Sequence, residues 1–557
     1  MAGVVVLVLL VASAFKGPDE RAAVQAYARA WERGDTRAMH RLLTGAAKGA
    51  HPYDDFAARQ QGALATATAT KVATGTPRKA GEHSWRLPVR VETKAFGPVR
   101  GVVAFDVADE DGEARLDWHP EDVFPGLARG ERLKRTTRMP DRADLLARDG
   151  TALAEGTERT STLGAAAEAI VGTVGPVPKE RAAEVRRRGL PTDAQIGLTG
   201  LERIFEERLA GTPGGELRAG LRLLAKREPR KAQPVRTTLD VGVQTAAVAS
   251  LAGRLGGVVA LDPRNGEVLG VAGIGFSGLQ PPGSTFKIIT LAAALDAGVA
   301  KPSDTFPVQT AATLSGVELE NANGEACGGT LAESFAESCN SVFAPMGAKL
   351  GAKRLVAAAE RFGFNTPPGI VGAATSTIPP AEEIGDDLAV GSSAIGQGRV
   401  QASALQMALV AATIARRGKR PAPTLDLEAA KQDAPTTTAV PASVARRVGR
   451  MMTGVVNAGT GTSAAIPGVT VAGKTGTAEL RSTKRCEPDP SGVGGSESCP
   501  ADQQPDPTDT TAWFAAYAPA GDRQPRVAVG LYVVGAGAGG ETAAPAAKQV
   551  LLAALKR

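Results

Sequence analysis

An amphipathic pattern near the start of the chain predicts the first elements. Apolar residues recur three and four positions apart across residues 20–44, and Gly34 and Asp35 interrupt the pattern. Because a helix buries one face of this kind, the spacing predicts two helices joined at residues 34–35. The core-facing stripe of the first helix comprises Val24, Tyr27, Ala28 and Trp31.

Two segments with alternating apolar and polar residues come next. Residues 84–95 and 99–107 show this alternation, which is typical of half-buried strands. With the two helices, these strands predict a small α+β unit over residues 19–130. Residues 138–235 are rich in arginine and in turn-forming residues, so we expect an extended linker or pedestal domain there.

A larger unit begins at residue 237, where the apolar segments become longer. Residues 257–262 and 268–272 predict two strands joined by a turn, and an apolar helix is expected to start at Ser284. Helices enclosed by N-terminal and C-terminal strands of one antiparallel sheet predict an α+β or α/β core in residues 237–557. Further helices are expected in 330–362, 400–417 and at the C-terminus, and further strands in 469–472, 512–518 and 526–534.

The first residues of the chain are almost entirely apolar. Residues 3–15 form a run of apolar or small residues that ends at Lys16. This run is shorter than the ~20 residues that span a bilayer core, and no Lys or Arg precedes it. Two interpretations stay open for residues 1–16: a cleaved export signal, or a truncated membrane anchor. Both place the rest of the chain outside the cytoplasm.

Composition and charge narrow the class of protein only slightly. The chain is 43% apolar and 22% charged, which suits ordinary globular cores. Its net charge is +6, but Lys and Arg are scattered, without the basic, aromatic-interleaved stripe of a nucleic-acid-binding surface. We therefore expect no nucleic-acid partner, and a mildly basic surface suits an anionic cell envelope.

Three short motifs, far apart and in a fixed order, carry the candidate chemistry. They are Ser-Thr-Phe-Lys at residues 284–287, Ser-Cys-Asn at 338–340 and Lys-Thr-Gly-Thr at 474–477. A lone Ser-x-x-Lys motif is weak, because a second copy occurs at residues 13–16 and about one or two chance copies are expected in a chain of this length. The specific signal is the combination of all three.

Ser284 and Lys287 are the candidate nucleophile and base. Ser284 is expected at a helix N-terminus, where backbone N–H groups favour negative charge, and Lys287 one turn later should project beside the Ser284 hydroxyl. All four histidines precede residue 120, which leaves Lys287 as the expected base. A base must be a neutral amine, so its pKa must be lowered by burial or by a second cation, for which Lys474 is the candidate.

The second motif supplies the next two groups. Ser338 is the candidate relay of a proton to the leaving amine, and Asn340 is the candidate amide that holds the substrate. The backbone N–H groups of Ser284 and Thr477 are our candidate oxyanion hole.

The third motif is expected to continue the strand at residues 469–472. Gly476 would let the substrate approach this strand closely. Thr475 and Thr477 would bind a substrate carboxylate through their hydroxyl groups, and Lys474 would supply positive charge.

The four cysteines are too few to hold the fold together. Cys486 and Cys499 flank a loop rich in Gly, Pro, Ser and Asp, and they are candidate disulfide partners in an oxidising compartment. Their spacing predicts no zinc site. Cys339 lies inside the second motif and Cys327 lies 12 residues before it, but nothing in the pattern supports their pairing. The loop at residues 480–508 either gates the site or covers a strand edge.

With these motifs the chain resembles a class B penicillin-binding protein, a serine D,D-transpeptidase that cross-links peptidoglycan. Residues 396–398 (GQG) and 513–519 (WFAAYAP) match further stretches of that family's catalytic domain. Residues 138–235 resemble its dimerisation or pedestal domain through 148–150 (RDG), although Ala147 stands where aspartate is common. Residues 19–130 resemble the NTF2-like N-terminal domain of the methicillin-resistance type.

The resemblance implies an architecture of several domains. The fold class would be multidomain α+β. A signal or anchor at 1–16 would precede the NTF2-like domain at 19–130, the pedestal domain at 138–235 and the transpeptidase domain at 237–557. The last of these would have the penicillin-binding, β-lactamase-like fold, an antiparallel sheet flanked by helices.

The resemblance also implies an activity and partners. Ser284 would be acylated by a peptidoglycan stem peptide ending in D-Ala-D-Ala, and an amine of a neighbouring stem would then take the acyl group. β-Lactam antibiotics would acylate the same serine. No metal or organic cofactor is implied. The protein would act at the extracytoplasmic face of the bacterial plasma membrane, associated with it, beside other cell-wall synthesis proteins.

Other functions fit part of the pattern. A β-lactamase or D,D-carboxypeptidase passes the acyl group to water, and class A lactamases use an extra glutamate for this step. Glu382 and Glu383 are candidates for this glutamate, but they lie in a segment outside the three motifs. Two extra domains are also not needed for drug hydrolysis. A non-catalytic penicillin-binding sensor or scaffold has no need of Lys287 or Ser338. A bifunctional synthase would need an acidic polymerase signature, which the N-terminal domain lacks.

Overall fold

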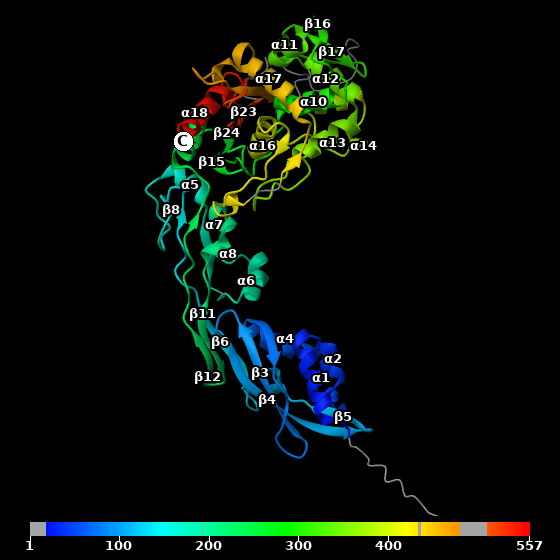
Figure 1. Cartoon of the computed structure of the whole chain (residues 1–557), viewed down its shortest axis with the longest axis vertical. Coiled ribbons are helices and arrows are strands. Elements are labelled where there is room, and N and C mark those ends of the chain that lie inside the picture. Colours follow the sequence, from blue (N-terminus) through cyan, green and yellow to red (C-terminus); the bar gives the residue numbers. More distant parts are fainter. Residues whose placement is uncertain (1–17, 192, 433–435, 480–509) are drawn as a thin grey trace, which may run out of the picture. The chain divides into compact units, whose positions relative to one another are not determined.

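The computed structural model describes residues 18–191, 193–432, 436–479 and 510–557 (Figure 1). The predicted signal or anchor at 1–16 and the predicted pair Cys486 and Cys499 lie outside these residues. Across the described ranges, every helix is too short or too polar to cross a bilayer. The chain divides into two compact units: Met1–Ala143 with Val174–Ile196 and Glu207–Gln233, and Asp144–Thr173 with Gly197–Glu206 and Pro234–Arg557.

In the first unit, helices pack against an antiparallel sheet with strand order β1-β3-β4-β5, to which β2 adds by pairing with β3. The predicted break between two helices is confirmed, because α1 ends at Gly34 in the left-handed conformation (φ 68°). The predicted stripe on α1 is buried and joins the core of this unit. Its elements are α1 (Glu20–Arg33), α2 (Thr36–Arg41), α3 (Gly45–Ala50), α4 (Tyr53–Thr66), β1 (Ala69–Thr74), β2 (Arg78–Lys79), β3 (Ser84–Thr93), β4 (Val99–Glu110) and β5 (Glu113–Asp117).

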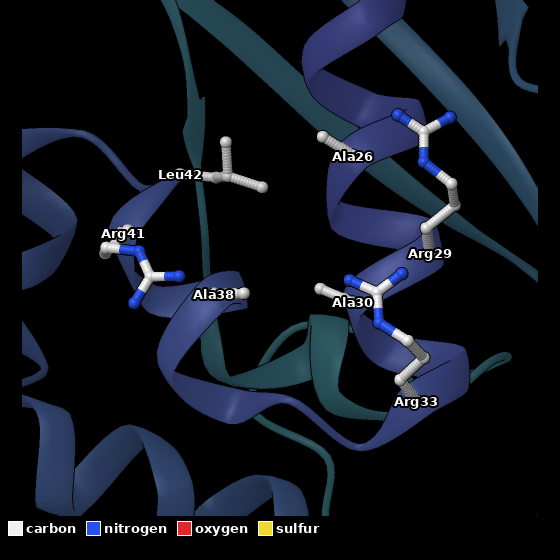
Figure 2. Close-up of a pocket in the computed structure, with 7 residues that line it drawn as sticks. All are labelled: Ala26, Arg29, Ala30, Arg33, Ala38, Arg41 and Leu42. Atoms are coloured by element: carbon white, nitrogen blue, oxygen red, sulfur yellow. The ribbon is translucent and has the colours of Figure 1, made fainter.

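A cavity of about 290 Å³ opens between α1 and α2 in this unit (Figure 2). Apolar side chains and the stems of three exposed arginines line it. The lining residues are Ala26, Arg29, Ala30, Arg33, Ala38, Arg41 and Leu42. The three motifs belong to the second unit, so this cavity is not part of the site that they form.

The segment expected as one pedestal domain is shared between the two units. In the first unit, a three-stranded sheet has the order β12-β11-β6. In the second unit, α5 lies against α9 (Val241–Leu251), where the side chain of Gln244 donates a hydrogen bond to the carbonyl of Ala166 (2.9 Å). The elements are β6 (Leu133–Arg138), β7 (Leu145–Leu146), β8 (Ala152–Ala154), α5 (Ala165–Val171), β9 (Val174–Pro176), α6 (Ala182–Arg188), β10 (Gln195–Gly197), α7 (Gly200–Ile204), α8 (Glu206–Leu209), β11 (Gly214–Ala219), β12 (Arg222–Arg227) and β13 (Val235–Arg236).

A five-stranded antiparallel sheet with order β15-β14-β24-β23-β22 forms the centre of the second unit. The predicted hairpin is confirmed as β14 and β15. The strand predicted at 469–472 begins only at Ala472, and it runs through the third motif to Glu479. The strands are β14 (Gly256–Leu261), β15 (Val268–Gly273), β22 (Ala472–Glu479), β23 (Thr510–Ala518) and β24 (Val527–Val533).

Helices flank this sheet, which confirms the multidomain α+β class and an antiparallel sheet between helices (Figure 1). Side chains of α9 and α18 share one core with alternate residues of β14, β23 and β24. The helix α16 is buried along almost its whole length and packs on β14, β23 and β24. The main helices are α10 (Lys287–Asp296), α11 (Leu331–Ala336), α12 (Asn340–Leu350), α13 (Ala352–Phe362), α14 (Ala381–Ile384), α15 (Asp387–Ala394), α16 (Ala404–Ala415), α17 (Ala442–Ala458) and α18 (Ala543–Leu555).

Short strands and turns complete the second unit. The predicted start of a helix at Ser284 is wrong in detail, because a 3₁₀ turn, η3 (Gly283–Phe286), precedes the α-helix that begins at Lys287. The short strands are β16 (Thr305–Gln309), β17 (Ala311–Leu314), β18 (Val317–Glu320), β19 (Cys327–Thr330), β20 (Lys419–Arg420) and β21 (Thr437–Thr438).

Candidate active site

The three motifs meet in the second unit around two buried lysines. Lys287 Nζ donates hydrogen bonds to the backbone oxygen of Ser338 (2.6 Å) and to Asn340 Oδ1 (2.7 Å). Lys474 Nζ, on β22, donates to Ser338 Oγ (2.8 Å). The hydroxyl of Ser338 also lies 3.3 Å from Lys287 Nζ. The second motif therefore connects the first and third motifs, and its hydroxyl lies between the two amines.

Ser284 is half-buried in the 3₁₀ turn that leads into α10. In a 3₁₀ turn, side chains three residues apart lie above one another, so Ser284 and Lys287 share one side of the turn. The hydrogen bonds that Lys287 Nζ makes within the described residues run to Ser338 and Asn340. The spacing of the first motif predicted that Lys287 lies on the same side of the turn as Ser284. It did not predict the hydrogen bonds from Lys287 to Ser338 and Asn340.

Two glycines allow the turn that carries Ser284 to lie directly against β22. A Cβ atom on Gly283 would lie 2.6 Å from the carbonyl oxygen of Thr477, and one on Gly476 would lie 2.8 Å from that of Pro282. Gly283 also has a φ of 51°, which glycine adopts at little energetic cost. Gly476 was expected to admit substrate. In the structure it allows close approach of the turn that carries Ser284.

Ser338 has an uncommon backbone conformation. It connects α11 to α12 with a φ of 65°, in the left-handed region that residues with a Cβ atom rarely adopt. This conformation brings both its backbone oxygen and its hydroxyl towards the amines. Strained backbone of this kind persists where the surrounding structure holds it and is common at active sites.

Burial determines the charge state of both lysines. Lys287 is fully buried, and burial, followed by repulsion from Lys474, holds its pKa well below the usual range. Burial also lowers the pKa of Lys474 to about 7, opposed by the negative charge of Glu337. The rings of Phe343 and Phe335 lie 5.7 Å from Lys287 Nζ and 5.6 Å from Lys474 Nζ. Both causes expected for a lowered pKa of Lys287, burial and a second cation, are present.

The two threonines of the third motif differ in their surroundings. The hydroxyl of Thr475 is hydrogen-bonded to that of Thr460 (2.6 Å), and Thr475 is only 5% exposed. Thr477 is half-buried, and its hydroxyl accepts a hydrogen bond from the backbone N–H of Gly539 (3.4 Å). Both were expected to bind a carboxylate through their hydroxyl groups, and Thr477 is the more accessible of the two.

Two features at the site were missed in the sequence. Cys327 and Cys339 form a disulfide, with Cα atoms 5.8 Å apart, although the pattern did not support their pairing. The position of Cys339 inside a motif was the only available signal. Thr460, which follows α17, belongs to no motif, so nothing in the sequence indicated that it lies at the site. Its backbone N–H donates a hydrogen bond to the carbonyl of Ala336 (3.2 Å), and its hydroxyl is hydrogen-bonded to that of Thr475.

Other candidate groups lie apart from these contacts. Glu382 and Glu383 are exposed on α14, and Glu383 forms an ion pair with Arg399 (3.7 Å).

Among the residues that the structure describes, no group of three or more His, Cys, Asp or Glu side chains is arranged to hold a metal ion.

The chain matches two family models. Residues 256–552 match the penicillin-binding protein transpeptidase domain, and residues 137–219 match the penicillin-binding protein dimerisation domain. It is 34% identical to the peptidoglycan D,D-transpeptidase PbpA of Mycolicibacterium smegmatis, over 64% of this chain and 80% of that protein. It is 35% identical to PbpA of Mycobacterium tuberculosis, over 50% of this chain and 55% of that protein.

Solved structures give the same result. The crystal structure of penicillin-binding protein A from Mycobacterium tuberculosis matches 74% of this chain and 99% of its own, with a TM-score of 0.57 and 26% identity. Its ceftriaxone acyl-enzyme complex matches equally well by TM-score, 0.57. A D,D-transpeptidase domain from Eggerthella lenta matches with a TM-score of 0.58 and 27% identity, over 75% of this chain and 98% of that one.

Proposed function

We infer that this chain, which belongs to the class B penicillin-binding proteins, is a peptidoglycan D,D-transpeptidase that β-lactams acylate. One observation carries the chemistry: Lys287 is buried, and its two closest hydrogen bonds go to oxygen acceptors, the Ser338 carbonyl and Asn340 Oδ1. A neutral amine has two hydrogens and one lone pair. With both hydrogens donated, the lone pair is left to accept a proton from Ser284.

Acylation then proceeds from these contacts. Ser284 Oγ attacks the carbonyl carbon of the penultimate D-Ala while Lys287 Nζ takes the hydroxyl proton. The backbone N–H groups of Ser284 and Thr477 receive the oxyanion. As the C–N bond breaks, the proton passes from Lys287 through the Ser338 hydroxyl to the nitrogen of the departing D-Ala. The distances of 3.3 Å and 2.8 Å from Ser338 Oγ to the two lysine amines support this relay.

Transfer reverses these roles. An amine of a neighbouring stem peptide attacks the ester carbonyl, Lys287 takes a proton from it, and the C–O bond to Ser284 breaks as Ser284 regains its proton. Asn340 contacts Lys287 through its oxygen, so its role includes holding the base as well as the predicted contact with substrate. Lys474 and Thr477 would bind the substrate carboxylate, whereas Thr475 would support them through Thr460.

The finer architecture is part of the proposal. We assign residues 19–130 to an NTF2-like domain of the methicillin-resistance type, supported by its antiparallel sheet packed against helices. Residues 138–235 form the dimerisation or pedestal domain and 237–557 the transpeptidase domain. Membership in a cell-wall transpeptidase family places the activity outside the cytoplasm. Membrane attachment through residues 1–16 and contact with other cell-wall synthesis proteins complete the proposal.

Labelling with a fluorescent penicillin tests the activity. The protein should form a stable covalent adduct, and Ser284→Ala should abolish it. Release of the label within minutes would favour a β-lactamase, and a lack of labelling would favour a scaffold. Lys287→Met is the matched test of the base: it should leave the fold intact and slow labelling by at least about a hundredfold.

A further inference from the structure

The segment at residues 320–327 is joined at three points to the second motif and the residue that follows it. Asn340 Nδ2 donates a hydrogen bond to the carbonyl of Glu320 (2.9 Å). The backbone N–H of Ser341 donates to Asn321 Oδ1 (2.8 Å). The third connection is the disulfide between Cys327 and Cys339. One covalent bond and two hydrogen bonds therefore attach this segment to the start of α12.

The segment is itself held in place. Asn321 is 5% exposed, and its Nδ2 donates hydrogen bonds to the carbonyls of Gln309 (2.8 Å) and Glu325 (2.9 Å). Cys327 begins β19, which pairs antiparallel with β16. The disulfide therefore connects the motif to a hydrogen-bonded strand pair instead of a free loop.

The disulfide acts on the residues that surround Lys287. Cys339 is fully buried between Ser338 and Asn340, the two residues whose oxygens accept the hydrogen bonds of Lys287. Ser338 has its left-handed φ of 65° immediately before Cys339. Such a conformation needs support from its surroundings, and a covalent bond one residue away supplies it.

We propose that the Cys327–Cys339 disulfide is a positioning element of the active site: it holds Ser338 and Asn340 against Lys287, and breaking it slows acylation of Ser284. The proposal rests on the function inferred above. A displacement of about 1 Å in such contacts reduces rates by up to about a hundredfold. Both cysteines act through their neighbours and do not touch substrate.

The test starts from a parent carrying Cys486→Ser and Cys499→Ser, so that Cys327 and Cys339 are the only remaining cysteines. Dithiothreitol breaks the S–S bond, each cysteine sulfur gains a hydrogen, and the two sulfurs of the reagent join in its cyclic disulfide. After removal of the reagent without air, a thiol count should give two. The rate of labelling by fluorescent penicillin should fall by about tenfold or more, and reoxidation should restore it.

A variant without the disulfide tests the proposal even if dithiothreitol does not reach the buried sulfurs. Cys327→Ser in the same parent removes the bond and leaves Cys339, inside the motif, unchanged. We expect the low rate with and without dithiothreitol. If the thiol count shows that the reagent does not reach the buried sulfurs, the labelling rate of this variant tests the proposal on its own. Its melting temperature, compared with that of the parent, reports any loss of folded protein.

The pH profile distinguishes positioning from general destabilisation. Labelling needs neutral Lys287. The charge of Lys474 on β22 lowers the pKa of Lys287, and the charge of Glu337, before Ser338, raises the pKa of Lys474. If Ser338 and Asn340 move away, water reaches Lys287, its pKa rises, and the rising limb of the rate moves to higher pH. Partial unfolding would lower the rate by the same factor at every pH.

Two results would overturn the reasoning at different levels. If Cys327→Ser is labelled within a factor of about two of the parent, with an unshifted pH profile, the disulfide has no positioning role. If the oxidised parent itself is not labelled at Ser284, the proposed function fails instead.

Discussion

Replacing Lys474 with methionine removes a cation that repels Lys287. Ser338 Oγ lies 3.3 Å from Lys287 Nζ and 2.8 Å from Lys474 Nζ, so the two nitrogens are at most about 6 Å apart. At an effective dielectric constant of ~20, two unit charges at this distance repel by about 2.8 kcal/mol, or about two pKa units. Lys474, with a pKa of about 7, carries about half a charge near neutrality. We therefore expect the pKa of Lys287 to rise when this charge is removed.

The direction of this pKa shift can be measured from the pH dependence of acylation. In the proposed mechanism Lys287 acts as a neutral base, so the acylation rate should rise with pH through the pKa of Lys287. A raised pKa moves the rising limb to higher pH, and the rate constant of labelling by fluorescent penicillin should show this between about pH 5 and pH 9. The pH at which the rate rises is the quantity to compare, because Lys474 is also proposed to bind the substrate carboxylate, and loss of that contact would lower the maximal rate.

A control variant and a contrary result complete the test. Lys353 is exposed on α13, so Lys353→Met should leave the pH profile unchanged. The methionine at position 474 has a similar length and stays apolar, which keeps Lys287 buried. A rising limb that stays in place, or that moves to lower pH, would show that Lys474 does not lower the pKa of Lys287.

Three further predictions follow from single contacts. Glu337→Gln removes the negative charge that raises the pKa of Lys474, so the affinity for β-lactams should decline at a lower pH than in the wild type; saturation of labelling as a function of pH measures this. Thr460→Val leaves the buried hydroxyl of Thr475 without its 2.6 Å partner, which should lower the stability of the second unit by ~1–3 kcal/mol in thermal unfolding and slow labelling. Burial raises the pKa of Asp122 to about 8, so the folded first unit keeps a proton that the unfolded chain releases above pH ~4, and stability should fall as pH rises from ~4 to 8. Asp122→Asn should flatten that slope in near-ultraviolet circular dichroism melts, and an unchanged slope would contradict the assignment.

Local patterns were sufficient to predict most elements of the fold. The apolar stripe on α1 and the alternation in β3 and β4 are properties of neighbouring residues, and each element forms where predicted. Boundaries were less predictable where a long-range contact sets them. The turn η3 replaces the first turn of the predicted α-helix, and there Gly283 donates its backbone N–H to the carbonyl of Gly396 (3.0 Å).

The sequence predicted which residues belong to the candidate site, but it predicted only some of the contacts between them. The motifs identified Ser284, Lys287 and Ser338, and the absence of histidine after residue 119 made lysine the expected base. The sequence could not show that Lys287 donates to Ser338 across a separation of 51 residues, or that Lys474 does so across 136. Spacing within a motif predicts only neighbours on one element, whereas these partners come from different elements.

The lowered pKa of Lys287 depends on the meeting of all three motifs and not on any single one. Burial against Ser338, β22 and its own turn lowers this pKa, and such burial needs backbone contacts without side chains between them. A Cβ atom on Gly283 or Gly476 would lie within 3 Å of a facing carbonyl oxygen, so a larger residue at either position would part the turn from the strand and admit water. A chain with both motif serines and both motif lysines in place would then keep its candidate nucleophile and lose its candidate base, because a hydrated Lys287 stays protonated at neutral pH. These two glycines, one beside the first motif and one inside the third, are therefore as necessary to the proposed chemistry as the residues that carry it out.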